Sequence, residues 1–275
     1  MTGNNPSITI DADNRQALYI IKTGGHVIDD EERLYSFLAD FSSIHKQKIL
    51  VHGGGKIASA IGEKLGIEPN YVDGRRITDD ATIDLVTMVY GGLINKKIVA
   101  VLQSLQCNAI GLTGADANLL LARKRPVGSV DYGWVGDIEA AGINYTWQLL
   151  LDNGLIPVVA SLTHDGHGHM LNTNADTIAA VLAKSLSALY RVKLVYCFEK
   201  NGILESVNDE NSLLAHMDVS TYHQLQGSKK LFAGILPKID NAFDAVNHGV
   251  QEVRIGNSSA LLQLIAGEGG TQIIA

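Results

Sequence analysis

Short apolar runs alternate along the chain with longer segments in which apolar residues recur at helical spacing. An apolar run bounded by Gly, Pro or polar residues predicts a buried strand, whereas apolar residues three and four positions apart predict an amphipathic helix. Strands are expected at 18–22, 48–52, 109–112, 156–160, 191–196 and 252–255. Helices are expected at 31–45, from 56 onward, and at 81–105, 145–152, 175–186 and 238–247. This alternation predicts an α/β fold on a parallel or mostly parallel sheet.

Two segments interrupt this alternation, at 71–78 and 119–135. Apolar and charged residues mix there with Gly, and in the second segment with Pro, as they do in hairpins. Such hairpins either cover a ligand or lie on the surface without a function, and the pattern leaves both interpretations open.

Composition sets the limits for the function. The 275 residues are 46% hydrophobic, which is enough for a substantial core and an enclosed site. With 22 Lys and Arg against 29 Asp and Glu, the net charge is -7, and no basic run argues for nucleic acid as a partner. An anionic ligand must then be held by a few focused cations and backbone N–H groups. Cys107 and Cys197 lie in separate apolar stretches, so both are predicted to be core thiols rather than parts of a disulfide or zinc site.

The chain start is polar. Asp11 and Asp13 lie where a signal peptide would need an apolar core, so no export is expected. No apolar run approaches the roughly 20 residues of a membrane span. We therefore expect a cytoplasmic protein without a membrane partner, in a compartment that holds ATP and Mg²⁺.

Two glycine-rich turns directly follow the first two predicted strands. They are Lys22-Thr23-Gly24-Gly25 and His52-Gly53-Gly54-Gly55-Lys56. Both lie at carboxyl ends of strands, the edge where α/β sheets bind ligands, and glycine there lets backbone N–H groups approach phosphate oxygens. Neither turn is a P-loop or a dinucleotide fingerprint. Each alone is compatible with an ordinary tight turn.

Lys22 favours the functional interpretation, because a lysine that ends a buried strand beside two glycines needs an anion to pair with. Lys238 is a second candidate: it follows Pro237, a residue suited to the first turn of a helix, and so lies near the electropositive helix end. A solvated helix residue is the simpler explanation for Lys238 alone. Before the helix at 175–186, capping explains one polar residue of Asn172, Asn174 and Asp176, and Asp176 is the candidate that orients the two lysines.

Seven motifs in this order make the chain resemble the amino-acid kinase family nearly end to end. They are Lys22-x-Gly24-Gly25, His52-Gly53-Gly54-Gly55, Gly74-Arg75-Arg76-Ile77-Thr78, Gly91-Gly92-Leu93-Ile94-Asn95-Lys96, Trp134-Val135-Gly136, Asn172-x-Asn174-Ala175-Asp176 and Gly234-Ile235-Leu236-Pro237-Lys238.

The resemblance implies the amino-acid kinase fold, a three-layer αβα sandwich on a mostly parallel central sheet. It implies that residues 1–188 bind an acyl-glutamate and form a homodimer, and that residues 189–275 bind ATP with Mg²⁺. It further implies transfer of the γ-phosphoryl group to the side-chain carboxylate of an N-acyl-L-glutamate, in arginine biosynthesis. A carboxylate needs no general base to act as the nucleophile at neutral pH, which agrees with the lack of a convincing catalytic His.

The resemblance also assigns roles by motif position. Lys22 and Lys238 would stabilise the transferring phosphoryl group, with Asp176 holding both. Arg76 and Asn172 would clasp the α-carboxylate and the acylamino group, with Asn174 as a supporting contact. The phosphate and the substrate would be cradled by four glycines, Gly24, Gly25, Gly53 and Gly54.

Two positions depart from the family pattern. Arg75 stands where the family has an apolar residue beside the acyl group, so an acyl chain with a second carboxylate, as in N-succinyl-L-glutamate, is an alternative substrate; an Arg75 turned to solvent is the other explanation. Glu199 stands where relatives have Asp in the nucleotide site. Glu199 and Gly202 remain candidates for nucleotide binding.

Several alternatives stay open. Within the family, the acceptor could be glutamate, aspartate, carbamate or a nucleoside monophosphate, although Arg76 and Asn172 favour an acylated amino acid. A non-catalytic nucleotide-binding regulatory module is a rival of another class, and a dinucleotide oxidoreductase lacks its glycine fingerprint. The run from His164 to His169 predicts an exposed hairpin through Asp165-Gly166 rather than a metal site, and no metal ligands are assigned. The resemblance links arginine feedback to an additional N-terminal helix, and the short polar start predicts an arginine-insensitive enzyme.

Overall fold

The computed structural model describes residues 14–138, 142, 144–206, 209, 212–227 and 235–274. Residues 1–13 lie outside the described residues, and with them the polar chain start on which the export and arginine-feedback predictions depend. Gly234 of the last motif lies outside them as well.

A single eight-stranded sheet forms the centre of the molecule, in the strand order β12-β14-β13-β11-β1-β2-β8-β5. Every neighbouring pair is parallel except β13 and β14. The predicted mostly parallel sheet is confirmed. The strands are β1 (Ala17–Thr23), β2 (Gln47–His52), β5 (Ala109–Leu112), β8 (Ile156–Ala160), β11 (Arg191–Phe198), β12 (His216–Met217), β13 (Glu252–Asn257) and β14 (Thr271–Ile273).

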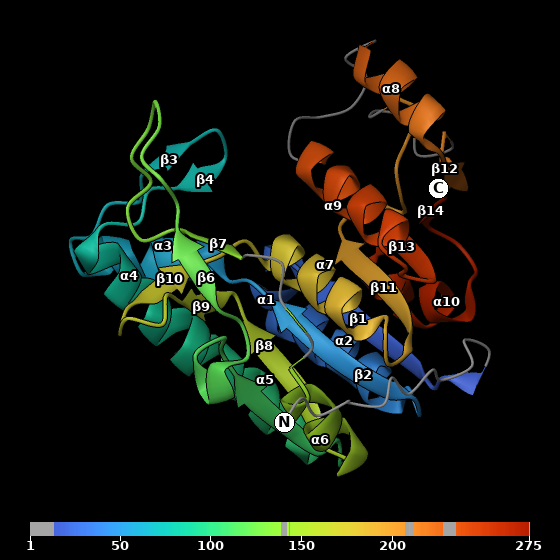
Figure 1. Cartoon of the computed structure of the whole chain (residues 1–275), viewed down its shortest axis with the longest axis horizontal. Coiled ribbons are helices and arrows are strands. Elements are labelled where there is room, and N and C mark those ends of the chain that lie inside the picture. The colour runs from blue at the N-terminus through green and yellow to red at the C-terminus, as the bar shows by residue number, and fades with distance from the viewer. Residues whose placement is uncertain are drawn as a thin grey trace, which may run out of the picture.

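Helices cover both faces of the sheet, which confirms the αβα sandwich (Figure 1). One apolar core joins the sheet to α6 (Thr146–Asp152), α7 (Ala175–Leu186) and α9 (Leu236–Asn247). The other joins it to α2 (Glu31–Ser43), α5 (Asn95–Ser104) and α10 (Leu261–Ala266). The remaining helices are α1 (Gly25–Ile28), α3 (Gly55–Lys64), α4 (Asp80–Val86), α8 (Val219–Gly227) and short 3-10 turns at Asp116–Asn118 and Ser258–Ala260.

The alternation of side chains along β1 decides which face Lys22 joins. Leu18 and Ile20 are buried in the core with α7 and α9, whereas Tyr19 and Ile21 are buried in the core with α2. Successive side chains of a strand point to opposite faces. Lys22 has the parity of Leu18 and Ile20, so it points to the face that α7 and α9 cover.

Three hairpins lie beside the sheet, and both segments that interrupt the sequence pattern form one. They are β3 (Tyr71–Val72) with β4 (Arg75–Arg76), β6 (Ala122–Lys124) with β7 (Gly136–Ile138), and β9 (Leu162–His164) with β10 (Met170–Asn172). The first two lie side by side (Figure 1) and are joined where the Thr78 N–H donates to the Tyr132 carbonyl at 2.9 Å. Gly133 makes this approach possible, because a Cβ there would lie 2.2 Å from the Thr78 carbonyl oxygen.

One long helix corrects the expectation about apolar length. The structure joins α4, a π-helix (Thr87–Ile94) and α5 into one helix, Asp80–Ser104, of 25 residues, which is long and apolar enough to cross a membrane. Ile98 and Leu102 are fully buried in the core between this helix and the sheet. The side of this helix that carries Ile98 and Leu102 therefore belongs to the core.

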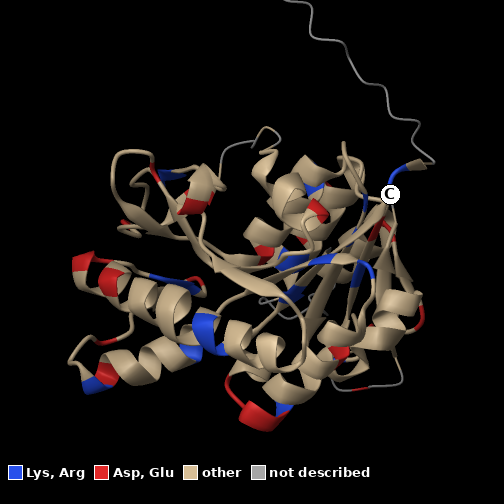
Figure 2. Ribbon diagram, turned by 90° about the horizontal axis from the view of Figure 1, so that it is seen from below, with Lys and Arg blue, Asp and Glu red and all other residues tan. Residues whose placement is uncertain are grey.

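Charge is mixed over the described elements. Figure 2 shows Lys and Arg interspersed with Asp and Glu along the ribbon. This distribution agrees with a chain that has no basic run.

Lys48 is a buried cation that the sequence pattern hides within an apolar strand. Its side chain is 2% exposed, and its ammonium donates to the carbonyls of Phe41 at 2.7 Å, Ser42 at 3.0 Å and Ile44 at 2.7 Å. These carbonyls belong to the C-terminal end of α2, where that of Phe41 also accepts from the Ile44 N–H at 3.3 Å. Lys48 thus caps α2, and burial lowers the pKa of its ammonium.

We predict that Lys48→Met lowers the free energy of unfolding by about 2 kcal/mol, because three carbonyls of the α2 end lose a charged donor in a buried place. Lys46→Met, at an exposed neighbouring position, is the matched control and should change stability by less than about 0.5 kcal/mol. Urea denaturation followed by circular dichroism measures both. Equal stability of the two variants would contradict the capping role.

Candidate functional site

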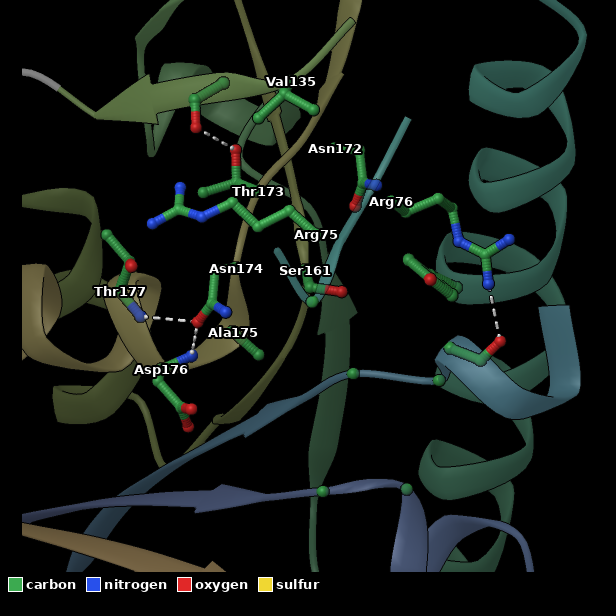
Figure 3. A pocket seen from close by; sticks show the side chains of 18 of the residues that line it. Arg75, Arg76, Val135, Ser161, Asn172, Thr173, Asn174, Ala175, Asp176 and Thr177 are labelled. Carbon is green, nitrogen blue, oxygen red and sulfur yellow. Dashed lines mark hydrogen bonds between the residues drawn. The ribbon is translucent and has the colours of Figure 1, made fainter. Parts of the chain in front are cut away.

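A cavity of about 310 Å³ opens at the carboxyl ends of β1, β2 and β8 (Figure 3). This is the sheet edge that the two glycine-rich turns predicted. Ten of the predicted site residues line it: Lys22, Gly24, Gly25, Gly53, Gly54, Arg75, Arg76, Asn172, Asn174 and Asp176.

Lys238 joins the cavity through Asp176. The Lys22 ammonium lies 2.8 Å from Asp176 Oδ1, and the Lys238 ammonium donates to Asp176 Oδ2 at 2.8 Å. The three side chains are 12%, 16% and 8% exposed for Lys22, Asp176 and Lys238. One carboxylate therefore holds two ammonium groups, as predicted for Asp176; Lys22 and Asp176 line the cavity, whereas Lys238 is not among the lining residues.

The charges of this cluster are strongly coupled. Burial alone would raise the pKa of Asp176, but the charges of Lys22 and Lys238 outweigh it and hold that pKa well below its ordinary range. Burial lowers the pKa of Lys238, which Asp176 opposes and the Lys22 charge reinforces. Two ammonium groups against one carboxylate leave a net positive charge that an anion in the cavity can balance.

Local structure explains why the cluster forms. Pro237 lies in the first turn of α9, so Lys238 sits at the electropositive end of that helix. Asn174 caps α7, where its side-chain oxygen accepts from the N–H groups of Asp176 at 2.7 Å and Thr177 at 3.2 Å. Capping thus accounts for Asn174, although it also lines the cavity.

Tyr196 is a further part of the cluster that the sequence analysis missed. Its hydroxyl donates to the Asp176 carbonyl at 3.1 Å, and its ring lies 5.1 Å from the Lys238 ammonium. Its position was hidden in the apolar strand at 191–196. In β11, Tyr196 alternates in step with Val192 and Leu194, which are buried in the core with α7 and α9. This alternation was the sequence signal that could have placed Tyr196 on the face of Lys22.

The two glycine-rich turns lie next to each other because Thr23 of β1 pairs with His52 of β2. Gly54 is closely packed: a Cβ there would lie 2.2 Å from Ile94 Cδ1 and 3.1 Å from Tyr90 Cδ1, so these side chains would have to shift. A Cβ at Gly24 would lie 3.5 Å from the Lys22 ammonium, so the lysine reaches back over this turn. Backbone and ammonium thus face the same space.

Arg76 is anchored on the opposite side of the cavity. It is 7% exposed, and Nη2 donates to the Gly55 carbonyl at 2.8 Å, to Ser59 Oγ at 2.7 Å and to the Tyr71 hydroxyl. Such bonds hold the planar guanidinium in one orientation. Asn172 is the partner predicted for Arg76, and both side chains line the cavity (Figure 3). The Asn172 carboxamide donates to Thr78 Oγ1 at 3.1 Å.

Arg75 lines the cavity, and a second arginine near it was not predicted. Arg125 binds Asp137, with Nε 3.0 Å from Oδ2, and both residues line the cavity. They come from the β6–β7 hairpin region, which the sequence pattern identified only as a hairpin. Pairing across that hairpin is what brings Arg125 to the cavity, and no local motif indicates it.

Glu199 and Gly202 lie outside the lining of this cavity. Glu199 follows β11 at the same sheet edge, with Oε2 4.0 Å from His26 Nδ1. Gly202 packs closely, since a Cβ there would lie 2.4 Å from Leu213 and 2.7 Å from Thr271 Oγ1. Close packing explains this glycine, and nucleotide binding by either residue stays a prediction.

The run from His164 to His169 lies in the predicted hairpin, and His52 is fully buried at the end of β2. Burial lowers the pKa of His52 to about 4, and its ring contacts the Gly53 carbonyl at 2.9 Å and Asn95 at 3.1 Å. It is neutral and structural at physiological pH. His164 and His169 belong to the β9–β10 hairpin, where Asp165 accepts from the His169 ring at 2.7 Å.

Comparisons with known proteins agree with this geometry. The sequence profile described as "Amino acid kinase family" matches residues 17–257. An acetylglutamate kinase from Cytophaga hutchinsonii is 54% identical over 251 residues, covering 91% of this chain and 95% of that protein. An acetylglutamate kinase from Methanopyrus kandleri is 37% identical and covers 89% of this chain and 96% of its own.

Solved structures show the same fold. The N-acetylglutamate synthase from Neisseria gonorrhoeae, complexed with coenzyme A and N-acetyl-glutamate, superposes with a TM-score of 0.78 at 24% identity, over 94% of this chain and 59% of that longer one. A carbamate kinase from Giardia superposes with a TM-score of 0.68 at 14% identity, over 94% of this chain and 99% of its own. The profile match and the identity to the curated relatives show that the chain belongs to the amino acid kinase family.

Proposed function

We propose that the protein is an N-acyl-L-glutamate 5-kinase of the acetylglutamate kinase type. It transfers the γ-phosphoryl group of ATP to the side-chain carboxylate of the acyl amino acid. The observation that carries this proposal is the convergence of Lys22 and Lys238 on Asp176 at the wall of one cavity. Curated acetylglutamate kinases at about half identity over most of the chain support the same acceptor.

The acceptor lies between Arg76 and the lysines in this proposal. Arg76 offers a fixed, planar guanidinium for the α-carboxylate, and Asn172 offers an amide for the acylamino group. The side-chain carboxylate then points toward Lys22 and the glycine-rich turns. Residues 1–188 thus supply the acyl-glutamate site, and residues 189–275 supply Lys238 and the ATP site, with Glu199 and Gly202 as candidate nucleotide contacts.

The chemistry needs no proton transfer. An oxygen of the ionised carboxylate attacks the γ-phosphorus, the bond from that phosphorus to the bridging oxygen of ADP breaks, and an acyl phosphate and ADP leave. Both reactants are anions, so the work of the protein is alignment and charge stabilisation. Lys22, Lys238 and backbone N–H groups of the glycine-rich turns face the space where negative charge spreads over the equatorial oxygens.

Mg²⁺ is expected to arrive with the nucleotide. Among the described residues, no group of three His, Cys, Asp or Glu side chains is placed to hold a metal ion, and both carboxylate oxygens of Asp176 face lysines. These residues therefore do not form a protein-built magnesium site. Phosphate oxygens and water are the ligands that suit Mg²⁺ in such a complex.

Cytoplasmic location, a role in arginine biosynthesis and a homodimeric state complete the proposal. Met88 and Leu93 are 58% and 52% exposed on the π-helix and supply an apolar surface for a second copy. Sedimentation equilibrium tests the dimer.

A hydroxamate assay tests the function. With MgATP and hydroxylamine, we expect the protein to form a hydroxamate from N-acyl-L-glutamate with a kcat/KM at least about 100-fold above that for L-glutamate or L-aspartate, because only the acylated substrate satisfies Asn172. Carbamate and a nucleoside monophosphate are tested as further acceptors, and their phosphorylation is measured as ADP release. A purified, folded protein that phosphorylates no acyl-glutamate would support the non-catalytic module instead.

A further inference from the structure

Arg75 and Arg76 are neighbours in β4 that face different parts of the cavity. Successive strand residues point in opposite directions, and Figure 3 shows Arg76 directed toward α3 while the Arg75 side chain runs across the cavity toward Thr173 and Thr177. Arg76 is anchored by three acceptors, as described above. Within the described residues, Arg75 has no ion-pair partner within 4 Å of its own.

Charge on the Arg75 side of the cavity is not balanced. Arg125 is paired with Asp137, whose Oδ2 lies 3.0 Å from Arg125 Nε. The hydrogen bond from Arg125 lowers the pKa of Asp137, and the charges of Arg125, Arg75 and Arg123 lower it further against the effect of burial. Arg75, Arg125 and Asp137 together therefore carry one positive charge on the cavity wall.

The lining has few aliphatic side chains against which a small acyl methyl group could pack. Among the described lining residues, the aliphatic side chains are those of Val135 and Ala175, and the rest are glycines, hydroxyl, amide, tyrosine and charged side chains. An acetyl methyl group would offer no anion to pair with the Arg75 guanidinium. In a succinyl group, the carboxylate carbon lies two bonds beyond the position of that methyl carbon and would supply an anion for Arg75.

We propose that Arg75, supported by the Arg125–Asp137 pair, recognises a second carboxylate at the end of the N-acyl group. The preferred acceptor is then an N-acyl-L-glutamate with a dicarboxylic acyl chain, of which N-succinyl-L-glutamate is the probe. This inference rests on the proposed kinase function and changes only the acyl group, since the attacking carboxylate and the bonds formed and broken are the same.

The test compares three acceptors in the hydroxamate assay: N-succinyl-, N-acetyl- and N-succinamoyl-L-glutamate. The succinamoyl compound has the size of the succinyl compound without its terminal charge. We expect kcat/KM for N-succinyl-L-glutamate to exceed both others by about 10- to 100-fold, the range of a charge-assisted hydrogen bond. Calorimetric titration of the same compounds without ATP should give dissociation constants in the same order.

Variants identify Arg75 as the source of the preference. Arg75→Leu should reduce the ratio of succinyl to acetyl kcat/KM by at least about tenfold, mainly through KM, and Arg75→Lys should retain part of it. Arg33→Leu, at an exposed arginine of α2 that does not line the cavity, is the matched control. Preference for N-acetyl-L-glutamate by the wild type, or an equal loss for both substrates in Arg75→Leu, would overturn this inference and leave the kinase proposal intact. Absence of phosphorylation of either acyl-glutamate would overturn the kinase proposal as well.

Discussion

Alanine in place of Lys22 or Lys238 is expected to lower kcat at least about a hundredfold. Each ammonium lies 2.8 Å from an oxygen of Asp176, which lines the cavity together with Lys22. In the proposed mechanism, both ammonium groups stabilise the transferring phosphoryl group. Loss of one preorganised donor to a developing anion typically has an effect of this size. Because the interaction strengthens in the transition state, kcat should fall more than the KM for either substrate rises. Steady-state kinetics with MgATP and the acyl-glutamate measures both parameters.

Two controls separate this effect from loss of folding. Lys97→Ala removes an exposed lysine that pairs with Glu31 outside the cavity and should leave kcat within about twofold. Lys22→Met retains side-chain volume and should be as inactive as Lys22→Ala while keeping the wild-type circular dichroism spectrum. Near-normal turnover in a folded Lys22 or Lys238 variant would remove the basis of the proposed mechanism.

Asp176→Asn is expected to lower the free energy of unfolding by about 3 to 5 kcal/mol at neutral pH. The carboxylate holds two ammonium groups that are 12% and 8% exposed, and removal of one partner from a buried ion pair leaves uncompensated charge. The folded-state pKa of Asp176 is depressed below its ordinary value of 3.8. Its contribution to stability is therefore complete above that value and is lost as the pH falls below it.

Urea denaturation at pH 7 and near pH 3 checks the size and the pH dependence of this effect. The difference between wild type and Asp176→Asn should be largest at pH 7 and smaller near pH 3. Combining Asp176→Asn with Lys238→Met removes one of the unpaired charges and should recover part of the stability. A difference that grows as the pH falls would contradict the ion-pair explanation.

The sheet, its helices and the core of the site follow from local patterns in the sequence. Alternation along β1 already places Lys22 on the face opposite Tyr19 and Ile21, and Pro237 already places Lys238 at a helix start. Parallel strands bring their carboxyl ends to one edge, so the two glycine-rich turns had to meet there. The hairpin at 71–78 could likewise be predicted, because apolar and charged residues mix there with Gly.

Other features depend on contacts between distant segments and could not be predicted. Arg125 reaches the cavity through pairing across its own hairpin, where its backbone N–H donates to the Val135 carbonyl at 2.8 Å. Lys48 looked like part of an apolar strand, although its partners are the carbonyls at the end of α2. The helix from Asp80 to Ser104 was predicted at 81–105, but no local pattern indicated the π-helical turns at Thr87–Ile94 within it.

The position of Lys238 in the last part of the chain has a consequence for biosynthesis. A ribosome must complete α9 before Lys238 can reach the cavity, whereas Lys22, Arg76 and Asp176 emerge earlier. A nascent chain released before residue 235 would hold most of the acceptor pocket and one lysine of the pair. Phosphoryl transfer by this pair of lysines therefore requires translation past Lys238, and a product terminated before that residue lacks one of the two cations.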